Sequence, residues 1–386
     1  MVKIQKVSEV CEIIMGQSPP SDSYNDKGIG MPFFQGKSEF GELNPTPKWY
    51  CSSPIRLAEV DDILISVRAP VGDVNIANVN CCIGRGLAAI RPDKTKLLTK
   101  FLFYVLKGKK REIENMGTGS TFKAISKKDL VNIKIPVPNI EIQKKIVNTF
   151  DKAQELIDKR KAQIEALDQL TQSVFLEMFG DPLANSKGWP TVKLKDYICK
   201  ITKINLKQNK DIIKYIDISS IDNYKNKITS YKEYIGSEAP SRAQQVVQKG
   251  DILISTVRPN LKNVAMVQDN FENLICSTGF CVIRCTDKLN NNFIFHLVKS
   301  DSFTKNLVRK TTGANYPAVK NSDIYDEIII YPPIDLQEKF SNITKQIEEK
   351  KTFLENSLPY QEKLFNSILQ KAFNGELFTE EKVSNF

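Results

Sequence analysis

The sequence contains a single histidine, His296, so little acid or base chemistry by imidazole is open to this chain. The two glycine-rich patterns that commonly bind phosphates, Gly-x-x-x-x-Gly-Lys-Ser/Thr and Gly-x-Gly-x-x-Gly, are both missing. We expect His296 to lie on a helix in a structural role. These absences favour a binding protein over an enzyme, and we assign no catalytic residue.

None of the eight cysteines has the paired Cys-x-x-Cys spacing that is typical of zinc sites. The loose group Cys276, Cys281 and Cys285 falls at strand-like positions, so we predict free thiols and no metal. No apolar run reaches the roughly 18 residues that span a membrane, and residues 1–6 have no apolar signal core. We therefore expect a cytoplasmic protein.

Acidic residues are outnumbered, because 55 Lys and Arg stand against 45 Asp and Glu, for a formal net charge of +10. An excess of this size favours a polyanionic partner, and nucleic acid is the first candidate. A lysine-rich soluble protein without such a partner is the alternative that charge alone leaves open.

Residues 140–179 contain neither glycine nor proline, and they lie between Pro138 and Gly180. Their apolar residues recur at alternating steps of four and three, which is a heptad stripe. The pattern predicts one helix of about 55 Å at 1.5 Å per residue, too long for the core of a compact domain. Such a helix is typical of a spacer between domains or of a surface for another chain.

The sequence also matches itself when it is shifted by 194 positions (313 minus 119). Gln143 then falls on Gln337, and the match continues along a second helical stretch. Farther upstream, the run Asp62–Ser66 recurs as Asp251–Ser255 at a shift of 189. This period is the size of a domain and exceeds the roughly 20–50 residues of solenoid repeats. The chain is therefore predicted to be a tandem duplication.

We predict an α+β protein in which two duplicated α/β domains are joined by two long antiparallel coiled-coil helices, with an internal pseudo-two-fold axis. Pro359 lies in the second helix, and because a proline usually kinks a helix, that helix is expected as one bent element or as two. The expected parts are a first domain over 1–139, a first long helix over 140–181, a second domain over 182–333, a second long helix over 334–375 and a tail over 376–386.

The stripe of each helix is expected to pack against the other helix or against a partner. Its members are Phe150, Ile157, Ile164, Leu167 and Val174 in the first helix and Ile347, Leu354, Leu358, Phe365 and Ile368 in the second.

Reading a DNA sequence requires donors and acceptors at base edges and cations on phosphates. Each half of the chain has such groups in its predicted loops, and the hydroxyl-rich loop before Phe122, with Tyr316 in its copy, is the strongest local candidate. A glycine turn that packs Phe122 inward is the alternative for this loop. The candidate DNA-binding residues are Lys37, Arg68, Arg85, Thr118, Ser120, Thr121 and Lys123 in the first half and Arg242, Arg258, Lys262, Lys310, Thr312, Asn315 and Tyr316 in the second.

The whole chain resembles the specificity subunit of type I DNA restriction-modification systems. The resemblance rests on the duplicated plan and on three segments, Thr118-Gly-Ser-Thr-Phe122, Ile135-Pro-Val-Pro-Asn-Ile-Glu-Ile-Gln143 and Phe175-Leu-Glu-Met-Phe-Gly-Asp181. It implies two target recognition domains, each of which reads one half of a bipartite DNA sequence. It also implies a coiled coil that sets the spacing of the half-sites and docks two modification subunits.

The same resemblance implies that the chain itself holds no cofactor. S-adenosylmethionine would belong to the modification partner, which methylates adenine for host defence, and ATP and magnesium to a restriction partner if one is present. Two other functions stay open at this point. One is a DNA-cleaving enzyme with an unrecognised carboxylate site, and the other is a coiled-coil scaffold whose domains bind proteins.

Overall fold

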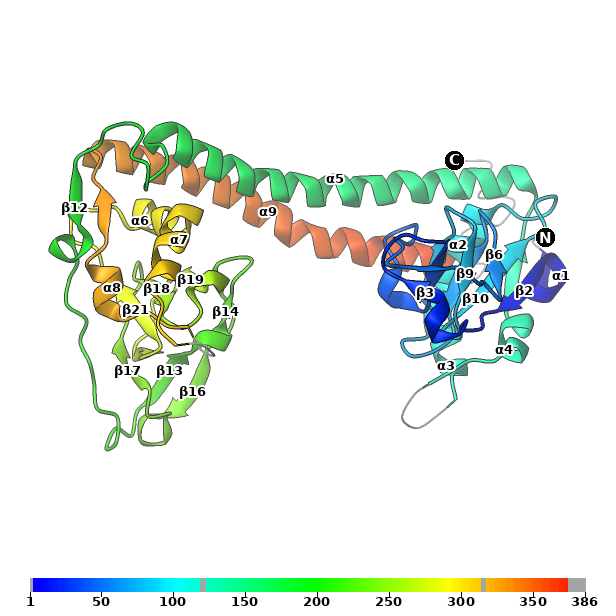
Figure 1. Ribbon diagram of the computed structural model, residues 1–386, viewed down its shortest axis with the longest axis horizontal. Coiled ribbons are helices and arrows are strands. Elements are labelled where there is room, and N and C mark those ends of the chain that lie inside the picture. The colour runs from blue at the N-terminus through cyan, green and yellow to red at the C-terminus, as the bar shows by residue number, and fades with distance from the viewer. Residues whose placement is uncertain (1–2, 119–122, 314–316, 374–386) are drawn as a thin grey trace. The chain divides into compact units, whose positions relative to one another are not determined.

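The computed structural model describes residues 3–118, 123–313 and 317–373. The chain divides into two compact units, and each is described by itself. Unit 1 comprises residues 1–162 and 355–386, and unit 2 comprises residues 163–354. Both units contain runs of strands followed by helices, so the α+β class is confirmed (Figure 1).

Unit 1 is built around an antiparallel four-stranded sheet in the order β2-β10-β7-β8, whose strands are Cys11–Met15, Leu87–Pro92, Ile63–Ser66 and Val74–Ile76. A second sheet of five short strands has the order β3-β5-β4-β9-β6, with bounds Tyr24–Asn25, Trp49–Cys51, Met31–Phe34, Cys81–Ile83 and Leu57–Ala58. Strand β7 is buried along its whole length, as its apolar run Ile63-Leu-Ile predicts.

The other elements of unit 1 surround these sheets. Strands β1 (Lys3–Lys6) and β11 (Lys134–Val137) pair antiparallel. The helices and 3-10 turns are α1 (Val7–Val10), η1 (Ser21–Ser23), η2 (Lys37–Glu39), α2 (Thr99–Gly108), α3 (Lys110–Met116) and α4 (Lys127–Asn132).

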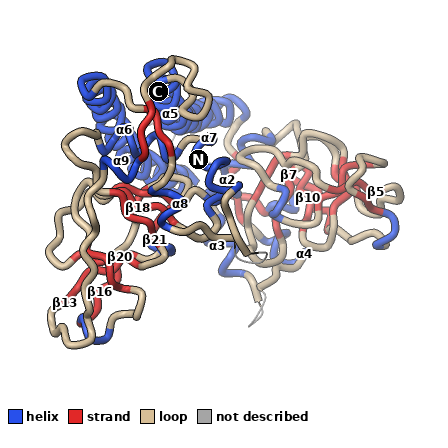
Figure 2. The backbone as a smooth tube through the Cα atoms, turned by 60° about the vertical axis from the view of Figure 1, so that its left-hand side comes forward, coloured by secondary structure: helices blue, strands red, loops and turns tan. Residues whose placement is uncertain are grey.

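Unit 2 contains corresponding pairings. The sheet β19-β18-β21 comprises Val264–Met266, Ile252–Ser255 and Phe280–Ile283, and the sheet β16-β13-β20-β17 comprises Lys232–Ile235, Ile212–Ile216, Leu274–Ser277 and Ala243–Val246. In each unit one pair inside the second sheet is parallel, β4 with β9 and β13 with β20. Within unit 2, the strands β13 and β16 lie on the side of β18 and β21 away from α6 (Figure 2).

The other elements of unit 2 are two antiparallel strand pairs and several short helices. Strand β12 (Thr191–Lys193) pairs with β22 (Ile328–Ile330), and β14 (Ile221–Asp222) pairs with β15 (Lys227–Ile228). The helices and 3-10 turns are η3 (Leu194–Tyr197), η4 (Ile218–Ser220), η5 (Gly236–Glu238), η6 (Pro259–Leu261), α6 (Asn291–Lys299), α7 (Asp301–Arg309) and α8 (Asn321–Tyr325).

Two helices of 40 residues each, α5 (Ile140–Phe179) and α9 (Ile334–Phe373), contribute to both units. The expected long helices are thus present. Helix α9 continues through Pro359, so it is a single element and the alternative of two segments is wrong. The proline removes one backbone hydrogen bond from the helix. The burial of Phe365 and Leu369, which follow the proline, offsets this loss and keeps residues 360–373 helical.

Within each unit the two helices run antiparallel and pack through aromatic rings. In unit 1 the rings of Phe150 and Phe365 are 5.6 Å apart, and in unit 2 those of Phe175 and Phe340 are 5.5 Å apart. The stripe drifts from strict heptad spacing. Phe175 is buried beside the half-buried Val174 that the stripe predicted.

The drift also affects the end of α9, where Ile368 is 37% exposed and its neighbour Leu369 is 1% exposed. The expected inward position of Ile368 is therefore wrong. A straight helix has 3.6 residues per turn, so a seven-residue stripe rotates by about 20° per heptad. Over the length of α9 this rotation moves the buried face by one residue.

Two buried polar contacts recur in both units. The Gln143 side chain, which is fully buried, accepts from the Leu98 amide (2.8 Å) and donates to the Pro138 carbonyl (2.8 Å). Gln337 makes the matching bonds in unit 2, at 3.0 and 2.8 Å. A buried amide left without these partners costs roughly 1–3 kcal/mol, so each glutamine fixes where its long helix begins.

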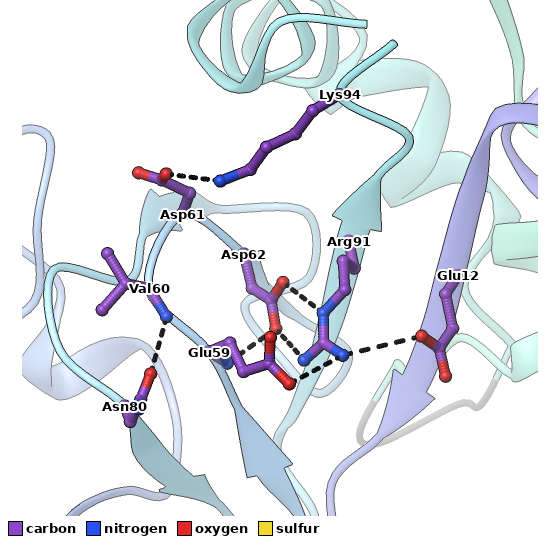
Figure 3. A network of polar contacts seen from close by, with 8 residues as sticks. All are labelled: Glu12, Glu59, Val60, Asp61, Asp62, Asn80, Arg91 and Lys94. Carbon is purple, nitrogen blue, oxygen red and sulfur yellow. Dashed lines mark hydrogen bonds and ion pairs between the residues drawn. The ribbon is translucent and has the colours of Figure 1, made fainter. Parts of the chain in front are cut away.

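The second recurring contact links an aspartate directly before one strand, β7 or β18, to an arginine at the end of the neighbouring strand, β10 or β21. Arg91 donates two hydrogen bonds of 2.9 Å to the carboxylate of Asp62, which is 1% exposed (Figure 3). In unit 2 Arg284 donates to Asp251 at 2.8 and 2.7 Å. The paired geometry satisfies a carboxylate that would be costly to bury alone.

Among the residues that the structure describes, no helix combines the length and the apolar character that crossing a membrane requires.

The ring of Phe150 offers a test of the helix packing in unit 1. It is 1% exposed and contacts Tyr104, Phe365 and Phe373. We predict that Phe150→Ala destabilises the chain by about 3–5 kcal/mol, because it leaves a cavity among these rings. Leu156→Ala on the same helix is the control, since Leu156 is 64% exposed. Denaturant unfolding of both variants checks this, and equal midpoints would contradict the packing.

Candidate nucleic-acid interface

In unit 1 several cationic residues gather where β7 ends. The amide of Val67 donates to the carbonyl of Gly86 (2.9 Å), and the amide of Ile125 donates to Val67 (3.0 Å). The amide of Ala69 donates to Lys123 (3.0 Å). These bonds hold three segments that are distant in sequence side by side.

This arrangement brings together three of the predicted DNA-binding residues. Arg68 follows β7, Arg85 precedes β10, and Lys123 lies in the strand-like segment that pairs with the end of β7. All three are exposed. Thr118, also exposed, lies beside them because it forms an antiparallel bridge with Ala124.

Four of the candidates lie outside the described residues. They are Ser120 and Thr121 in the first half and Asn315 and Tyr316 in the second, and Phe122 is likewise outside. The bases of both loops are described, at Thr118 with Ala124 and at Thr312 with Ala318.

Lys37 is placed differently from the arginines. Its ammonium is 2.6 Å from one oxygen of Asp73, and that of Lys110 is 2.6 Å from the other. Although partial burial opposes it, hydrogen bonds from Lys110 and Lys37 hold the pKa of Asp73 below its usual value. The three side chains carry one net positive charge, so Lys110 belongs with this cluster, and the sequence pattern did not single it out.

We call this set of three main-chain bonds at the end of β7 the junction of unit 1. Unit 2 has the same three bonds at the end of β18. The amide of Thr256 donates to Gly279 (3.0 Å), that of Val319 to Thr256 (2.9 Å) and that of Arg258 to Pro317 (2.8 Å). The Arg242 carbonyl accepts from the amide of Thr278, so exposed Arg242 is held next to this junction.

The repeated bonds show that the arginines of the two units are not equivalent. Arg258 makes the bond that Ala69 makes in unit 1, while Val257 takes the bridge position of Arg68. Arg258 also has a left-handed backbone (φ 50°), which is uncommon for a residue other than glycine. The two junctions thus share a backbone frame and differ in the side chains on it.

Two lysines of unit 2 are held in ion pairs inside the unit. Lys262 contacts the carboxylate of Asp301 at the start of α7. Lys310 lies 2.8 Å from Glu327, which is only 3% exposed. Lys310 therefore compensates a buried carboxylate inside the unit, whereas the neighbouring Thr312 is exposed.

The single histidine packs against two aromatic rings. His296 lies 5.4 Å from the ring of Phe295 and 5.2 Å from that of Phe340. Burial lowers its pKa to about 3, so the imidazole is neutral at physiological pH and does not take up a proton there. Within the described ranges, no group of three or more His, Cys, Asp or Glu is placed to hold a metal ion.

Comparison with known proteins identifies relatives over the full chain. The family model described as the type I restriction modification DNA specificity domain matches residues 1–166 and 186–361. The type I restriction enzyme MjaIX specificity subunit of Methanocaldococcus jannaschii is 25% identical over 427 aligned positions, which cover 98% of this chain and 94% of that protein.

Two further matches add to these. A protein of the same organism named as the MjaX specificity subunit is 50% identical over 163 residues, or 42% of this chain and 38% of that protein. The solved structure of a type I restriction-modification S subunit from M. genitalium has a TM-score of 0.54 and 16% identity, and the match covers 97% of this chain and 96% of that one. At this identity the likeness shows the fold alone.

The junction of unit 1 can be tested with Arg68→Ala combined with Lys123→Ala. If both cations contact phosphates, the affinity for duplex DNA falls and the slope of log affinity against log salt decreases by about 0.9 per contact. Lys94→Ala is the matched control, because exposed Lys94 follows the far end of β10 from Arg85 and pairs with Asp61 (Figure 3). Binding titrations at several salt concentrations measure the slopes. A wild-type slope in the double variant would exclude Arg68 and Lys123 as phosphate contacts.

Proposed function

Because this chain belongs to the type I restriction modification DNA specificity family, we propose that it is the DNA-recognition subunit of a type I restriction-modification complex. The observation that carries the proposal is the family model, which matches both residues 1–166 and residues 186–361. The match to the MjaIX specificity subunit over nearly the whole of both chains supports it. The net charge of +10 suits a polyanionic partner.

The two globular parts are proposed to be duplicated target recognition domains, over residues 1–139 and 182–333, related by a pseudo-two-fold axis. The repeated hydrogen bonds at the ends of β7 and β18 support a common origin. Each domain would read one half of a bipartite target. The unequal positions of Arg68 and Arg258 on the shared frame support different half-sites, since a side chain moved by one residue meets a different base edge.

The long helices, proposed over 140–181 and 334–375 with a tail over 376–386, would form the coiled coil that sets the spacing between half-sites. Antiparallel contacts in each unit support this, such as Arg160 with Ser357 and Asp168 with Lys351. Leu170 and Leu364, which the shift of 194 makes equivalent, are 46% and 60% exposed. Equivalent apolar positions suit the docking of two copies of one partner, the modification subunit.

In this proposal the chain is not catalytic. S-adenosylmethionine would be held by the modification subunits, and ATP and magnesium by restriction subunits where they are present. The low pKa of His296 makes its imidazole a weak base, which argues against general-base chemistry at this residue. Incubating the purified chain with DNA and magnesium tests the rival activity, since cleavage would favour a nuclease.

The spacing role predicts the result of a matched insertion. One heptad is inserted in α5 after Ala162 and one in α9 after Leu354, which preserves the register of both helices. Seven residues add roughly 10 Å, so the unspecified gap should lengthen by about three base pairs while both half-sites stay the same. Mapping methylated adenines in cells that carry the variant and its modification subunits measures the gap. A motif with the original gap would refute the spacing role.

Independent reading by the two domains predicts the outcome of a domain exchange. Replacing residues 1–139 with the matching part of another family member should change one half of the methylated motif and keep the other. The reciprocal exchange of residues 182–333 is the control, and it should change the opposite half. Methylation mapping is again the measurement, and a change of both halves in either chimera would argue against independent domains.

A further inference from the structure

Building on the proposed DNA recognition, we propose that the tip of the β14–β15 hairpin is a further DNA-contacting element, specific to unit 2. Tyr224 would place its ring against bases and sugars in a groove of the duplex. Lys225, its neighbour, would meet a phosphate. Neither residue was singled out from the sequence, because a lone Tyr-Lys pair in a polar loop has no distinctive pattern.

The exposure of Tyr224 is the first observation. Its side chain is 95% exposed, and it belongs to none of the apolar clusters of the described residues. An aromatic ring offers a large contact area and loses little conformational entropy when it is bound. Because folding leaves the Tyr224 ring in water, binding a partner is what can bury its apolar surface.

The hairpin tip is held in one shape, so its contact would be pre-organised. The carboxylate of Asp222 accepts the amides of Tyr224 (2.9 Å) and Lys225 (3.0 Å). Asn226 closes the turn with a left-handed backbone (φ 51°). Because Asp222 is bonded to these amides, its negative charge is partly compensated beside the exposed Lys225.

Side-chain amides attach this tip to the turn that carries the cations of unit 2. Asn223 donates to the carbonyl of Leu261 (3.1 Å), and Asn226 donates to that of Lys262 (3.1 Å). This turn, η6, begins directly after Arg258, whose amide is bonded to Pro317 in the stem of the second loop. The tip thus extends the proposed interface without a break.

The corresponding turn of unit 1 has the opposite character. It lies between Phe40 and Pro45, which form a bridge, and it packs on β8 as the β14–β15 hairpin packs on β19. Its tip carries Glu42, which is 3.8 Å from Lys161 of α5. A carboxylate there disfavours a phosphate, so the element belongs to the half-site that unit 2 reads.

The experiment uses the full-length chain and a duplex that carries its motif, which is obtained by mapping methylated adenines in cells with the wild-type system. A duplex with a shuffled motif measures non-specific binding. The variants are Tyr224→Ala, Tyr224→Phe and Lys225→Ala. Tyr360→Ala is the matched control, because Tyr360 is a tyrosine of α9 that is 76% exposed. Melting temperatures of all variants should equal that of the wild type.

We expect Tyr224→Ala to bind the motif about tenfold more weakly with an unchanged salt slope, and Tyr224→Phe to keep most of the affinity. Lys225→Ala should lower the salt slope by about one. In cells, Tyr224→Ala should relax the motif only in the half that changes when residues 182–333 are exchanged. Tyr360→Ala should match the wild type in each measurement.

Three results would overturn the inference. If Tyr224→Ala and Lys225→Ala bind DNA as Tyr360→Ala does, the tip is not part of the interface, although the proposed function stands. If Tyr224→Ala keeps its DNA affinity but no longer co-purifies with modification subunits, the tip docks protein instead. If the wild-type chain with its modification subunits shows no salt-dependent binding to the motif, the proposed function itself fails.

Discussion

The packing of the last phenylalanine of each long helix is the contact on which the rest of each unit depends. In unit 2 the ring of Phe179, at the end of α5, lies 4.7 Å from Phe293 of α6 and 5.4 Å from Phe340 of α9. In unit 1 the ring of Phe373, at the end of α9, lies 5.7 Å from Phe101 of α2 and 5.9 Å from Phe150 of α5. Each globular part is therefore fastened to two helices at once, and a rigid support is what a reader of bases requires.

At the junctions at the ends of β7 and β18, the backbone arrangement is independent of the side chains that could contact bases. Their hydrogen bonds join main-chain atoms, so they do not depend on which side chains are present. A change of side chain at Arg68 therefore removes none of these main-chain bonds. A family whose members recognise different DNA sequences would benefit from such a separation, because specificity can change without loss of the fold.

Several structural features followed directly from sequence patterns. The absence of glycine and proline from 140–179 predicted the helix α5, although the expected part ran on to 181, and the repeated run Asp62–Ser66 predicted two equivalent buried strands. Both are local signals, in which backbone propensity and hydrophobic spacing agree. The inward position of Ile368 failed because a small rotation per turn accumulates along a helix, and a heptad pattern does not record it.

The sequence by itself determined the internal repeat, the two long helices and the excess of positive charge, because periodicity and composition are properties of the chain alone. Tertiary structure decided which candidate lysines are held in ion pairs inside unit 2. Lys310 and Lys262 were candidates for DNA contact in the sequence, and each lies against a carboxylate that is distant in the chain. It also placed Tyr224 beside the Arg258 turn through two asparagine side chains. Such pairings depend on how the backbone folds back on itself, which no local pattern encodes.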